Sequence, residues 1–479
     1  MKKYVFILMS GLLCFMHVTG SEIRFGNEIS TRQELFLAEQ NIIRALDLAD
    51  DAVSAYFTGS EMAMARYYNP YTGKCSDEKG SIWMFTSAIE AVNAALRTIE
   101  IHKVNGNPVL YNKYFDRYIQ LLQELYSNAD YYLGTFHLTS YTQTAGWTVY
   151  GVHRSSVKGG AKVEGIENVY DDQMWLIREL LDSYKLTGNA YFLEKAEYLT
   201  AYVLDGWDCT IDTNGEEAGG ITWGPGYVTK HACSNGPMVS PLVWLYEHYK
   251  GKDNAITYRY IDPTDKQARK EQELRKSEYY LTFAKKIYHW QKQHLLREDG
   301  VYDDMLGGCT PSKPQMETVA GKTYRKGIVC LDKVGPAISY NSGTMLSGAA
   351  DLYRVTGEKE YYNDAVNLSD ASFSYFAKKD AELPGYYTYD ISGFGNWFNG
   401  VLLRGLIDIY PYYKDAAAYI DTFQRNLDYG YENFRYKGFL PVNLLTGWNQ
   451  NPGDNQVEGM FSFAFAAEYA LLSQYELKK

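Results

Sequence analysis

Two pairs of consecutive aspartates give the clearest chemical signal in the sequence. Asp171-Asp172 and Asp303-Asp304 each follow a tyrosine. Hydrolysis of a glycosidic bond uses two carboxyl groups: one protonates the leaving oxygen, and the other attacks the sugar or activates water. In hydrolases that retain the anomeric configuration, the two groups stand about 5–5.5 Å apart. An adjacent pair is therefore a candidate for this chemistry, provided that both side chains reach the same site.

The position of the first pair decides how its two carboxyls could differ. Neighbouring residues on a helix diverge by about 100°, so Asp171 and Asp172 suit a shared site best at the start of a helix. The helix dipole there stabilises one carboxyl as the anion, and repulsion raises the pKa of the other and keeps it protonated. The alternative, favoured for an isolated pair, is that Asp at a helix N-terminus simply caps the helix. A third pair, Asp50-Asp51, is expected on a solvated helix face.

Glycine- and aromatic-rich segments add candidate ligands for a sugar. Gly219 and Gly220 allow a close backbone approach just before Trp223, whose ring can stack on an apolar sugar face. Lys230 to Pro237 ends in a predicted helix start with Pro237 in its first turn, which leaves Lys230 without a capping role. Tyr340-Asn341 opens a further predicted helix. The histidines and cysteines show no metal-ligand spacing, and we find no nucleophile elbow for Ser/His/Asp catalysis.

The composition narrows the class of protein. The chain has 479 residues, 46% of them hydrophobic, which excludes a disordered chain or a small disulfide scaffold. Its formal net charge is −11 and no basic cluster is present, so we expect no nucleic-acid partner. The 45 tyrosines and 9 tryptophans suit a sugar-binding protein. Any single tyrosine, however, is more often a half-buried helix residue.

Helical periodicity dominates the chain and predicts an all-α protein. Strand signals are few, mainly Thr144 to Val152 and Tyr386 to Tyr389. The twelve predicted helices span residues 32–56, 81–102, 108–134, 170–187, 189–205, 236–250, 272–297, 341–356, 358–378, 396–412, 415–434 and 456–476.

An internal repeat suggests how these helices pair. Tyr184 to Gly188 and Tyr353 to Gly357 share the pattern Tyr-basic-aliphatic-Thr-Gly, in which a helix ends at a glycine and another begins at once. Recurring helical hairpins indicate a solenoid or a closed ring, and twelve helices make the six hairpins of an (α/α)6 barrel. We expect a single catalytic domain over residues 21–479. Its long loops, near residues 135–169, 206–234, 298–339 and 435–455, should carry the function at one end.

The first twenty residues resemble a secretory signal peptide. Met1-Lys2-Lys3 precedes an apolar run from Tyr4 to about Val18, which is too short to span a membrane. We expect cleavage near Gly20 and export to the periplasm, the medium or the cell surface of a bacterium. Lipidation at Cys14 is the less favoured alternative, because Leu13 is larger than such a site prefers. The other five cysteines form no disulfide framework and allow at most one or two bridges.

The order of these motifs resembles glycoside hydrolase family 76, the endo-α-1,6-mannanases. The matching segments run in order along most of the mature chain. The most specific is the Asp-Asp motif followed by an aromatic residue. The segments are Trp83 to Val92, Tyr170-Asp171-Asp172 with Trp175, Gly219 to Trp223, Lys230 to Pro237, Tyr340 to Gly343, and Asn396 to Arg404.

This resemblance implies an (α/α)6 barrel that hydrolyses α-1,6-linked mannose chains with retention. Asp171 would be the nucleophile and Asp172 the acid/base. The chemistry needs no metal or cofactor, and we expect a monomer whose partner is a polysaccharide or oligosaccharide. The candidate substrate-binding residues are Trp83, Tyr170, Trp175, Gly219, Gly220, Trp223, Lys230, Asn235, Asp303, Asp304, Tyr340, Asn341 and Trp397.

Four residues depart from the family pattern around the expected sugar site: Leu176, Thr222, Ser342 and Asn399. They leave the Asp pair intact and bear on the linkage or the decoration of the substrate. Two alternatives stay open. One is another (α/α)6 hydrolase, such as an unsaturated glucuronyl hydrolase, for which Lys230 is the only obvious partner of a uronide carboxylate. The other is a non-catalytic glycan-binding protein, although neither Asp of the pair is lost.

Overall fold

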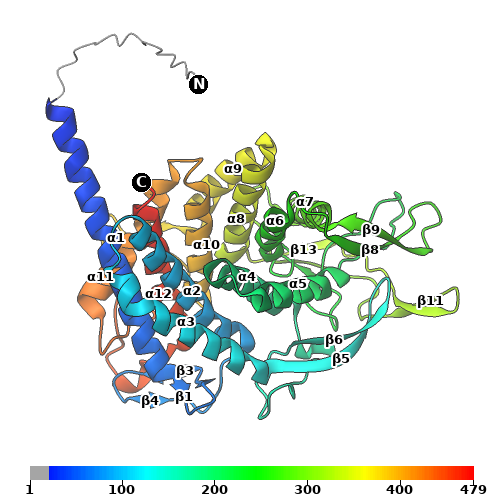
Figure 1. The fold of residues 1–479 in the computed structure, drawn as a ribbon, viewed down its shortest axis with the longest axis horizontal. Coiled ribbons are helices and arrows are strands. Elements are labelled where there is room, and N and C mark those ends of the chain that lie inside the picture. Colours follow the sequence, from blue (N-terminus) through cyan, green and yellow to red (C-terminus); the bar gives the residue numbers. More distant parts are fainter. Residues whose placement is uncertain (1–20) are drawn as a thin grey trace, which may run out of the picture.

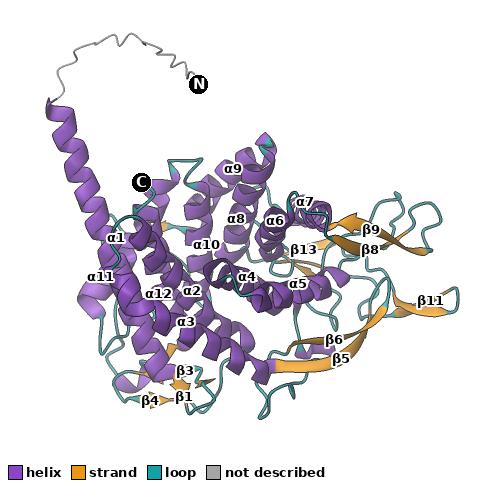
Figure 2. Ribbon diagram, viewed as in Figure 1, coloured by secondary structure: helices purple, strands orange, loops and turns teal. Residues whose placement is uncertain are grey.

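The computed structural model describes residues 21–479, mostly as α-helix (Figures 1 and 2). The predicted signal peptide, with Cys14, lies outside the described residues. All twelve predicted helices are present, with shifted ends. They are α1 (Ser21–Tyr56), α2 (Ile82–Val104), α3 (Val109–Ala129), α4 (Tyr170–Thr187), α5 (Ala190–Asp205), α6 (Val239–Tyr249), α7 (Lys276–Leu295), α8 (Ser339–Thr356), α9 (Lys359–Phe376), α10 (Gly395–Ile409), α11 (Ala416–Phe434) and α12 (Gly459–Glu476).

The even-numbered helices form a closed inner ring. Helix α2 packs on α4, α4 on α6, α6 on α8, α8 on α10 and α10 on α12, and α12 returns to α2. The odd-numbered helices lie outside this ring: α1 packs against α12 and α2, and α3, α5, α7, α9 and α11 pack against α2, α4, α6, α8 and α10 respectively. This alternation is an (α/α)6 barrel, so the predicted fold is confirmed.

Side-chain patterning explains which helices lie inside. In α12, every residue from Gly459 to Glu476 is buried, as expected for a helix surrounded by neighbours. In the outer helix α11, the buried apolar residues Ala416, Ile420, Phe423 and Leu427 recur every three or four positions and form one stripe. The ends of α4 and α8 also follow the predicted repeat, since their C-cap glycines have φ angles of 67° and 72°.

The strands are short and belong to loops between helices. They are β1 (Phe57–Thr58), β2 (Ala63–Met64), β3 (Tyr67–Asn69), β4 (Lys74–Cys75), β5 (Leu133–Thr139), β6 (Thr144–Tyr150), β7 (Lys230–His231), β8 (Ala255–Ile261), β9 (Arg269–Arg275), β10 (Met305–Gly307), β11 (Met316–Val319), β12 (Lys322–Arg325), β13 (Asp332–Val334), β14 (Lys378–Lys379), β15 (Tyr387–Thr388) and β16 (Val457–Glu458). None of the helices within residues 21–479 has the length and apolar character needed to cross a membrane.

Two long antiparallel hairpins correct the predicted helix ends. Helix α3 stops at Ala129, because Leu133–Thr139 pairs with Thr144–Tyr150 as the β5–β6 hairpin. Helix α7 begins at Lys276 rather than near residue 272, because Arg269–Arg275 pairs with Ala255–Ile261 as the β8–β9 hairpin. Pairing with the other strand of the hairpin overrides the local helical pattern at both points. Figure 1 shows both hairpins extending from the same side of the barrel.

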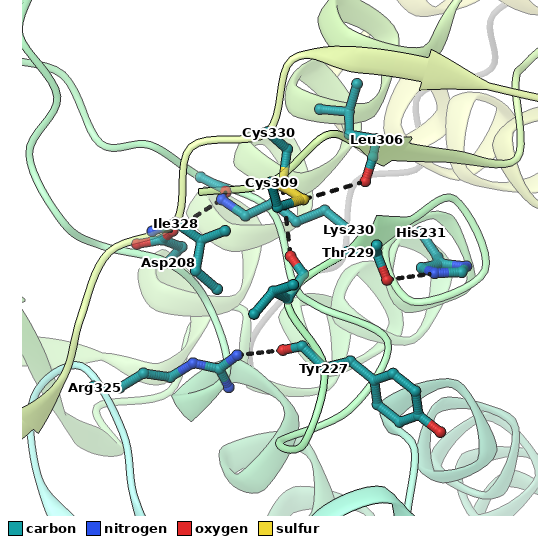
Figure 3. Close-up of a disulfide and its surroundings, with 12 residues drawn as sticks. Asp208, Tyr227, Thr229, Lys230, His231, Leu306, Cys309, Arg325, Ile328 and Cys330 are labelled. Atoms are coloured by element: carbon teal, nitrogen blue, oxygen red, sulfur yellow. Dashed lines mark hydrogen bonds and ion pairs between the residues drawn. A yellow bond between two sulfur atoms is a disulfide. The ribbon is translucent and has the colours of Figure 1, made fainter. Parts of the chain in front are cut away.

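A three-stranded sheet, in the order β13–β10–β7, joins two long loops. Strand β7 pairs with β10, and the Ala232 backbone N–H donates to the Asp304 carbonyl at 2.8 Å. A disulfide between Cys309 and Cys330 closes the loop beside this sheet (Figure 3). Cys75, Cys209 and Cys233 are free thiols. The sheet therefore brings the second Asp pair next to the Lys230 segment, although the two are far apart in the sequence.

Candidate active site

Helix α4 starts with the first Asp pair inside its first turn. The N-cap residue is Val169, and no side chain caps this helix end. The Tyr170 backbone N–H donates to the Trp223 carbonyl at 2.8 Å, which fastens the helix start to the Gly-Gly loop. Neither Asp171 nor Asp172 is the N-cap, so capping does not account for the pair.

A cavity of about 300 Å³ opens beside this helix start. Most of its lining side chains come from the N-terminal ends of the inner helices α2, α4, α8 and α10, and the rest come from the loops around β7 and β10. The cavity thus lies at one end of the barrel, and both helix ends and loops line it. The lining residues are Trp83, Asp171, Trp175, Trp223, His231, Cys233, Asp304, Ile338, Tyr340, Phe394 and Phe398.

The Asp171 carboxyl lies in the wall of this cavity. Its Oδ2 is 3.4 Å from the Trp223 indole nitrogen, which donates to it, and its Oδ1 accepts from the Asp172 backbone N–H at 3.1 Å. Burial raises the pKa of Asp171 to about 6, while hydrogen bonds from the Cys233 thiol and the Trp223 indole lower it. These donors stabilise the anionic form, which is the form that a nucleophile needs.

The Asp172 carboxyl is more deeply buried, with 6% of the residue exposed. It lies outside the set of cavity-lining residues, and among the described residues no hydrogen bond reaches it. Burial, together with the negative charge of Asp171, raises its pKa well above the ordinary range. The two neighbours therefore differ: Asp171 is the better anion and Asp172 the better proton carrier.

A cluster of rings supports the aromatic wall. Trp397 packs against Trp83 and Trp175 at ring-centre distances of 5.2 and 4.7 Å. The Trp175 indole N–H donates to the Tyr340 hydroxyl at 2.8 Å, and the Trp397 indole N–H donates to Glu90 at 3.1 Å. Trp397 does not line the cavity itself; it packs against Trp83 and Trp175, which do.

His231 is a lining residue for which the sequence analysis predicted no role. Its ring stacks on Trp223 with centres 5.1 Å apart, and its Nε2 lies 2.9 Å from the Thr229 hydroxyl (Figure 3). Burial lowers the pKa of His231 to about 4, so the imidazole is neutral at neutral pH. Adjacent residues of a strand point to opposite sides. If Lys230–His231 had been recognised as a strand, it would have suggested that only one of the two faces the cavity.

Cys233, Ile338, Phe394 and Phe398 also line the cavity without having been predicted. The two phenylalanines occupy the cap and first turn of α10. Four residues apart on a helix, they lie on the same face, and this spacing could have identified them. The four residues that depart from the family pattern, Leu176, Thr222, Ser342 and Asn399, do not line the cavity.

Lys230, Asn235 and Tyr170 lie away from the cavity. The Lys230 ammonium is buried, 2.9 Å from Asp208 and 2.5 Å from the Gly219 carbonyl oxygen (Figure 3). The Asn235 side chain accepts from the Ile221 backbone N–H and donates to the Ile221 carbonyl. Tyr170 packs against Tyr202 inside the protein. The side chains of these residues hold the loops in place.

Gly219 and Gly220 are likewise explained by the fold, because their backbone conformation and surroundings require glycine. Their φ angles are 68° and 77°, and a Cβ at either position would clash with the Trp290 ring.

The two residues of the second Asp pair lie in different places. Asp304 lines the cavity, whereas the Asp303 carboxyl lies 3.4 Å from the Arg297 guanidinium and does not line it. Asn341 does not line the cavity; its side-chain amide donates to the Asp303 backbone carbonyl at 3.4 Å.

Comparisons with known proteins agree with this architecture. A family model described as glycosyl hydrolase family 76 matches residues 272–392, a segment that runs from β9 to just before α10 and does not include Asp171. A family 76 mannosidase from Bacteroides thetaiotaomicron is 20% identical with a TM-score of 0.67, over 92% of this chain and 99% of that one. An α-mannanase from the same organism is 16% identical with a TM-score of 0.61, over 92% and 96%.

A third similar structure is an α-1,6-mannanase of Salegentibacter in complex with α-1,6-mannotriose. It is described as an inactive variant in which two consecutive aspartates are replaced by asparagine. It is 18% identical with a TM-score of 0.59, over 91% of this chain and 99% of that one. No curated protein matches the chain significantly. The predicted resemblance to family 76 is confirmed by the matched segment and by the fold.

Proposed function

Because the chain resembles glycoside hydrolase family 76 in a sequence segment and in its fold, we propose that it is a retaining hydrolase of α-1,6-linked mannose chains. The observation that carries this proposal is the Asp171-Asp172 pair: neither residue is the N-cap of α4, the Asp171 carboxyl lines an aromatic cavity, and the neighbouring Asp172 carboxyl is buried. The Salegentibacter mannanase supports it, since that enzyme was inactivated at two consecutive aspartates and binds α-1,6-mannotriose.

The proposed reaction proceeds in two displacements. The Asp171 carboxylate attacks the anomeric carbon while Asp172 donates its proton to the departing glycosidic oxygen, so one C–O bond forms as another breaks. Asp172, now an anion, then takes a proton from water, and the resulting hydroxide displaces Asp171 from the sugar. The product keeps the α configuration, and both carboxyls return to their starting states.

A second depression supports a chain-like substrate. A groove of about 740 Å³ shares Trp83 and Phe394 with the catalytic cavity and continues towards Arg66, Lys79 and Arg154. A polysaccharide that passes the Asp pair would have room to extend along it. This continuity supports an endo-acting mannanase over an enzyme that accepts only a terminal sugar.

The structure weighs against the uronide alternative. A glucuronyl hydrolase needs a cation for the substrate carboxylate, and Lys230, the candidate that the sequence suggested, is paired with Asp208. No Lys or Arg is found among the described residues that line the catalytic cavity. Two buried carboxyls destabilise the folded state, and in a non-catalytic glycan-binding protein no chemical role would offset this cost.

The deciding experiment is incubation of the purified protein with linear α-1,6-mannan, followed by sizing of the products and by NMR. We expect short oligosaccharides whose first-formed reducing ends have the α configuration. Asp171→Asn and Asp172→Asn variants serve as controls. Initial release of the β-anomer would contradict retention, and absence of products would contradict the proposal as a whole.

We also propose that the protein is exported, on the basis of the signal-like residues 1–20. The mass of the protein recovered outside the cytoplasm of an expressing bacterium would test this. A mature chain starting near Ser21 is expected. A chain that retains residues 1–20 would contradict it.

A further inference from the structure

A second cavity, of about 300 Å³, lies between the two long hairpins and the outer helices α5 and α7. We call it the hairpin cavity. It shares no lining residue with the catalytic cavity. Its volume falls at the lower end of the range for small-ligand sites. The lining residues are Tyr141, Thr142, Gln143, Trp147, Ala201, Leu204, Asp205, Trp207, Cys209, Ile256, Thr257, Tyr258, Arg259, Tyr279 and Phe283.

Three of these residues keep hydrogen-bonding capacity that the fold does not use. The Tyr141 hydroxyl, the Trp147 indole nitrogen and Asp205 Oδ2 are buried and have no partner among the described residues. Tyr141 is 1% exposed and Trp147 is 8% exposed. A buried polar atom without a partner costs about 1–3 kcal/mol. All three atoms belong to side chains that line this one cavity.

The rest of the wall holds these groups in place. The other Asp205 oxygen, Oδ1, accepts from the Ser140 hydroxyl at 3.0 Å and from the Gln143 side-chain amide at 2.9 Å. Trp147 is held by edge contacts with the Tyr198 and Tyr202 rings, at centre distances of 5.6 and 5.4 Å. The site is therefore built before any ligand arrives.

The chemistry of the wall selects a neutral, hydroxyl-bearing ligand. Asp205 Oδ2 needs a donor and the Trp147 N–H needs an acceptor, and a hydroxyl can serve as either. Six aromatic side chains line the same cavity and provide apolar faces for a ring. Arg259 and Asp205 are the charged residues of the lining, and Arg259 already pairs with Glu271 at 2.9 Å, so the wall offers no unpaired cation to an anionic ligand.

We propose that the hairpin cavity is a second, non-catalytic carbohydrate site that holds one sugar unit of a glycan chain. That this sugar is an α-1,6-linked mannose rests on the proposed function. A chain of ring contacts connects the two regions: Trp147 packs on Tyr202, and Tyr202 packs on Tyr170, the neighbour of Asp171. A long chain held here stays close to the enzyme between successive cuts.

Calorimetric titration of α-1,6-mannotetraose tests the proposal. The host protein is the full chain carrying Asp171→Asn and Asp172→Asn, which prevents hydrolysis. We expect two binding events. Adding Trp147→Ala should weaken one of them by roughly tenfold or more, as expected for a lost stacking ring, and should leave the other unchanged.

Two milder variants guard against a folding defect. Asp205→Asn keeps the size of the side chain and its Oδ1 acceptor, and Arg259→Ala lies on a hairpin strand outside the barrel; each should weaken the same event. Lys270→Ala is the matched control, since Lys270 sits on the facing strand, pairs with Asp262 and does not line the cavity. A single binding event in the host protein, or two events that none of the three variants changes, would overturn the proposal.

This outcome can be separated from the fate of the proposed function. If the wild-type protein hydrolyses α-1,6-mannan but the hairpin variants bind like the host, only the second site is refuted. If Trp147-dependent binding is found without hydrolysis by the wild-type protein, the second site stands and the proposed function is refuted.

Discussion

The Asp171→Asn variant should fold more stably than the wild-type protein at neutral pH while losing its activity. Burial raises the pKa of Asp171 from 3.8 to about 6, so keeping this carboxyl ionised at pH 7 costs the folded state up to about 3 kcal/mol. Asparagine has the same shape and no charge to bury. It gives up a favourable interaction of an anion with the helix dipole, about 0.3–1 kcal/mol, which leaves a net gain of about 2 kcal/mol.

The pH dependence of this gain follows from the sign of the pKa change. The folded-state pKa lies above the unfolded one, so the penalty is absent below about pH 4, where the carboxyl is protonated in both states. It grows between about pH 4 and 6 and is constant above that range. The stabilisation by Asp171→Asn should therefore be present at pH 7 and vanish near pH 4.

Urea unfolding followed by circular dichroism, at pH 7 and pH 4, measures the free energy of unfolding of both proteins. Asp253→Asn, an exposed substitution in the turn after α6, is the control and should change stability by less than about 0.5 kcal/mol. Asparagine caps a helix as well as aspartate does, so a capping role predicts no change for Asp171→Asn. No gain at pH 7, or an equal gain at pH 4, would refute the reasoning.

Further predictions follow from the same site. The hydrolysis rate should be bell-shaped in pH, with an acid limb near pH 6 from Asp171 and an alkaline limb from Asp172, whose pKa lies higher; a rate that stays flat from pH 5 to 9 would contradict this. Trp223→Ala should lower kcat/KM for mannan by roughly tenfold, as expected for a lost stacking ring; a change under twofold would remove Trp223 from the sugar site. Lys230→Met should lower the free energy of unfolding by about 3–5 kcal/mol, because it leaves the buried Asp208 carboxylate without its cationic partner, with only the Thr210 and Ile328 donors remaining, yet the folded fraction should keep its specific activity; selective loss of kcat in folded protein would give Lys230 a chemical role. Chelation with EDTA should leave activity unchanged, and loss of activity without unfolding would show a metal requirement.

Local sequence information was sufficient for the helices and for the Asp pair. Short-range patterns predict the twelve helices and the helix ends at Gly188 and Gly357. Apolar residues recur on one face of each helix, and a glycine stands where the backbone becomes left-handed. The motif Tyr170-Asp171-Asp172 could be read in the same way, because its residues are neighbours in the chain and belong to one helix turn. For such features, a few consecutive residues are enough to predict the local backbone geometry.

Residues whose role depends on a distant partner could not be assigned in this way. Lys230 looked like a ligand for substrate because no neighbour in the sequence explained it, but its partner is Asp208, on the other side of the Gly-Gly loop. Phe394 and Phe398 reach the catalytic cavity only because α10 packs beside α8 in the inner ring. The tyrosine content suggested sugar binding, yet the twelve largest fully buried side chains are all tyrosines.

The sequence by itself thus determined the helical class, the repeat of helical hairpins and the candidate pair of carboxyls. Only the tertiary structure decided which side chains surround that pair, that Lys230 and Asn235 support loops rather than line the cavity, and that two hairpins enclose a second cavity. The physical reason is that burial and pairing are properties of the closed ring. The desolvation that raises the pKa of Asp171 and Asp172, and the contacts that occupy or free a polar atom, arise only when segments hundreds of residues apart pack together.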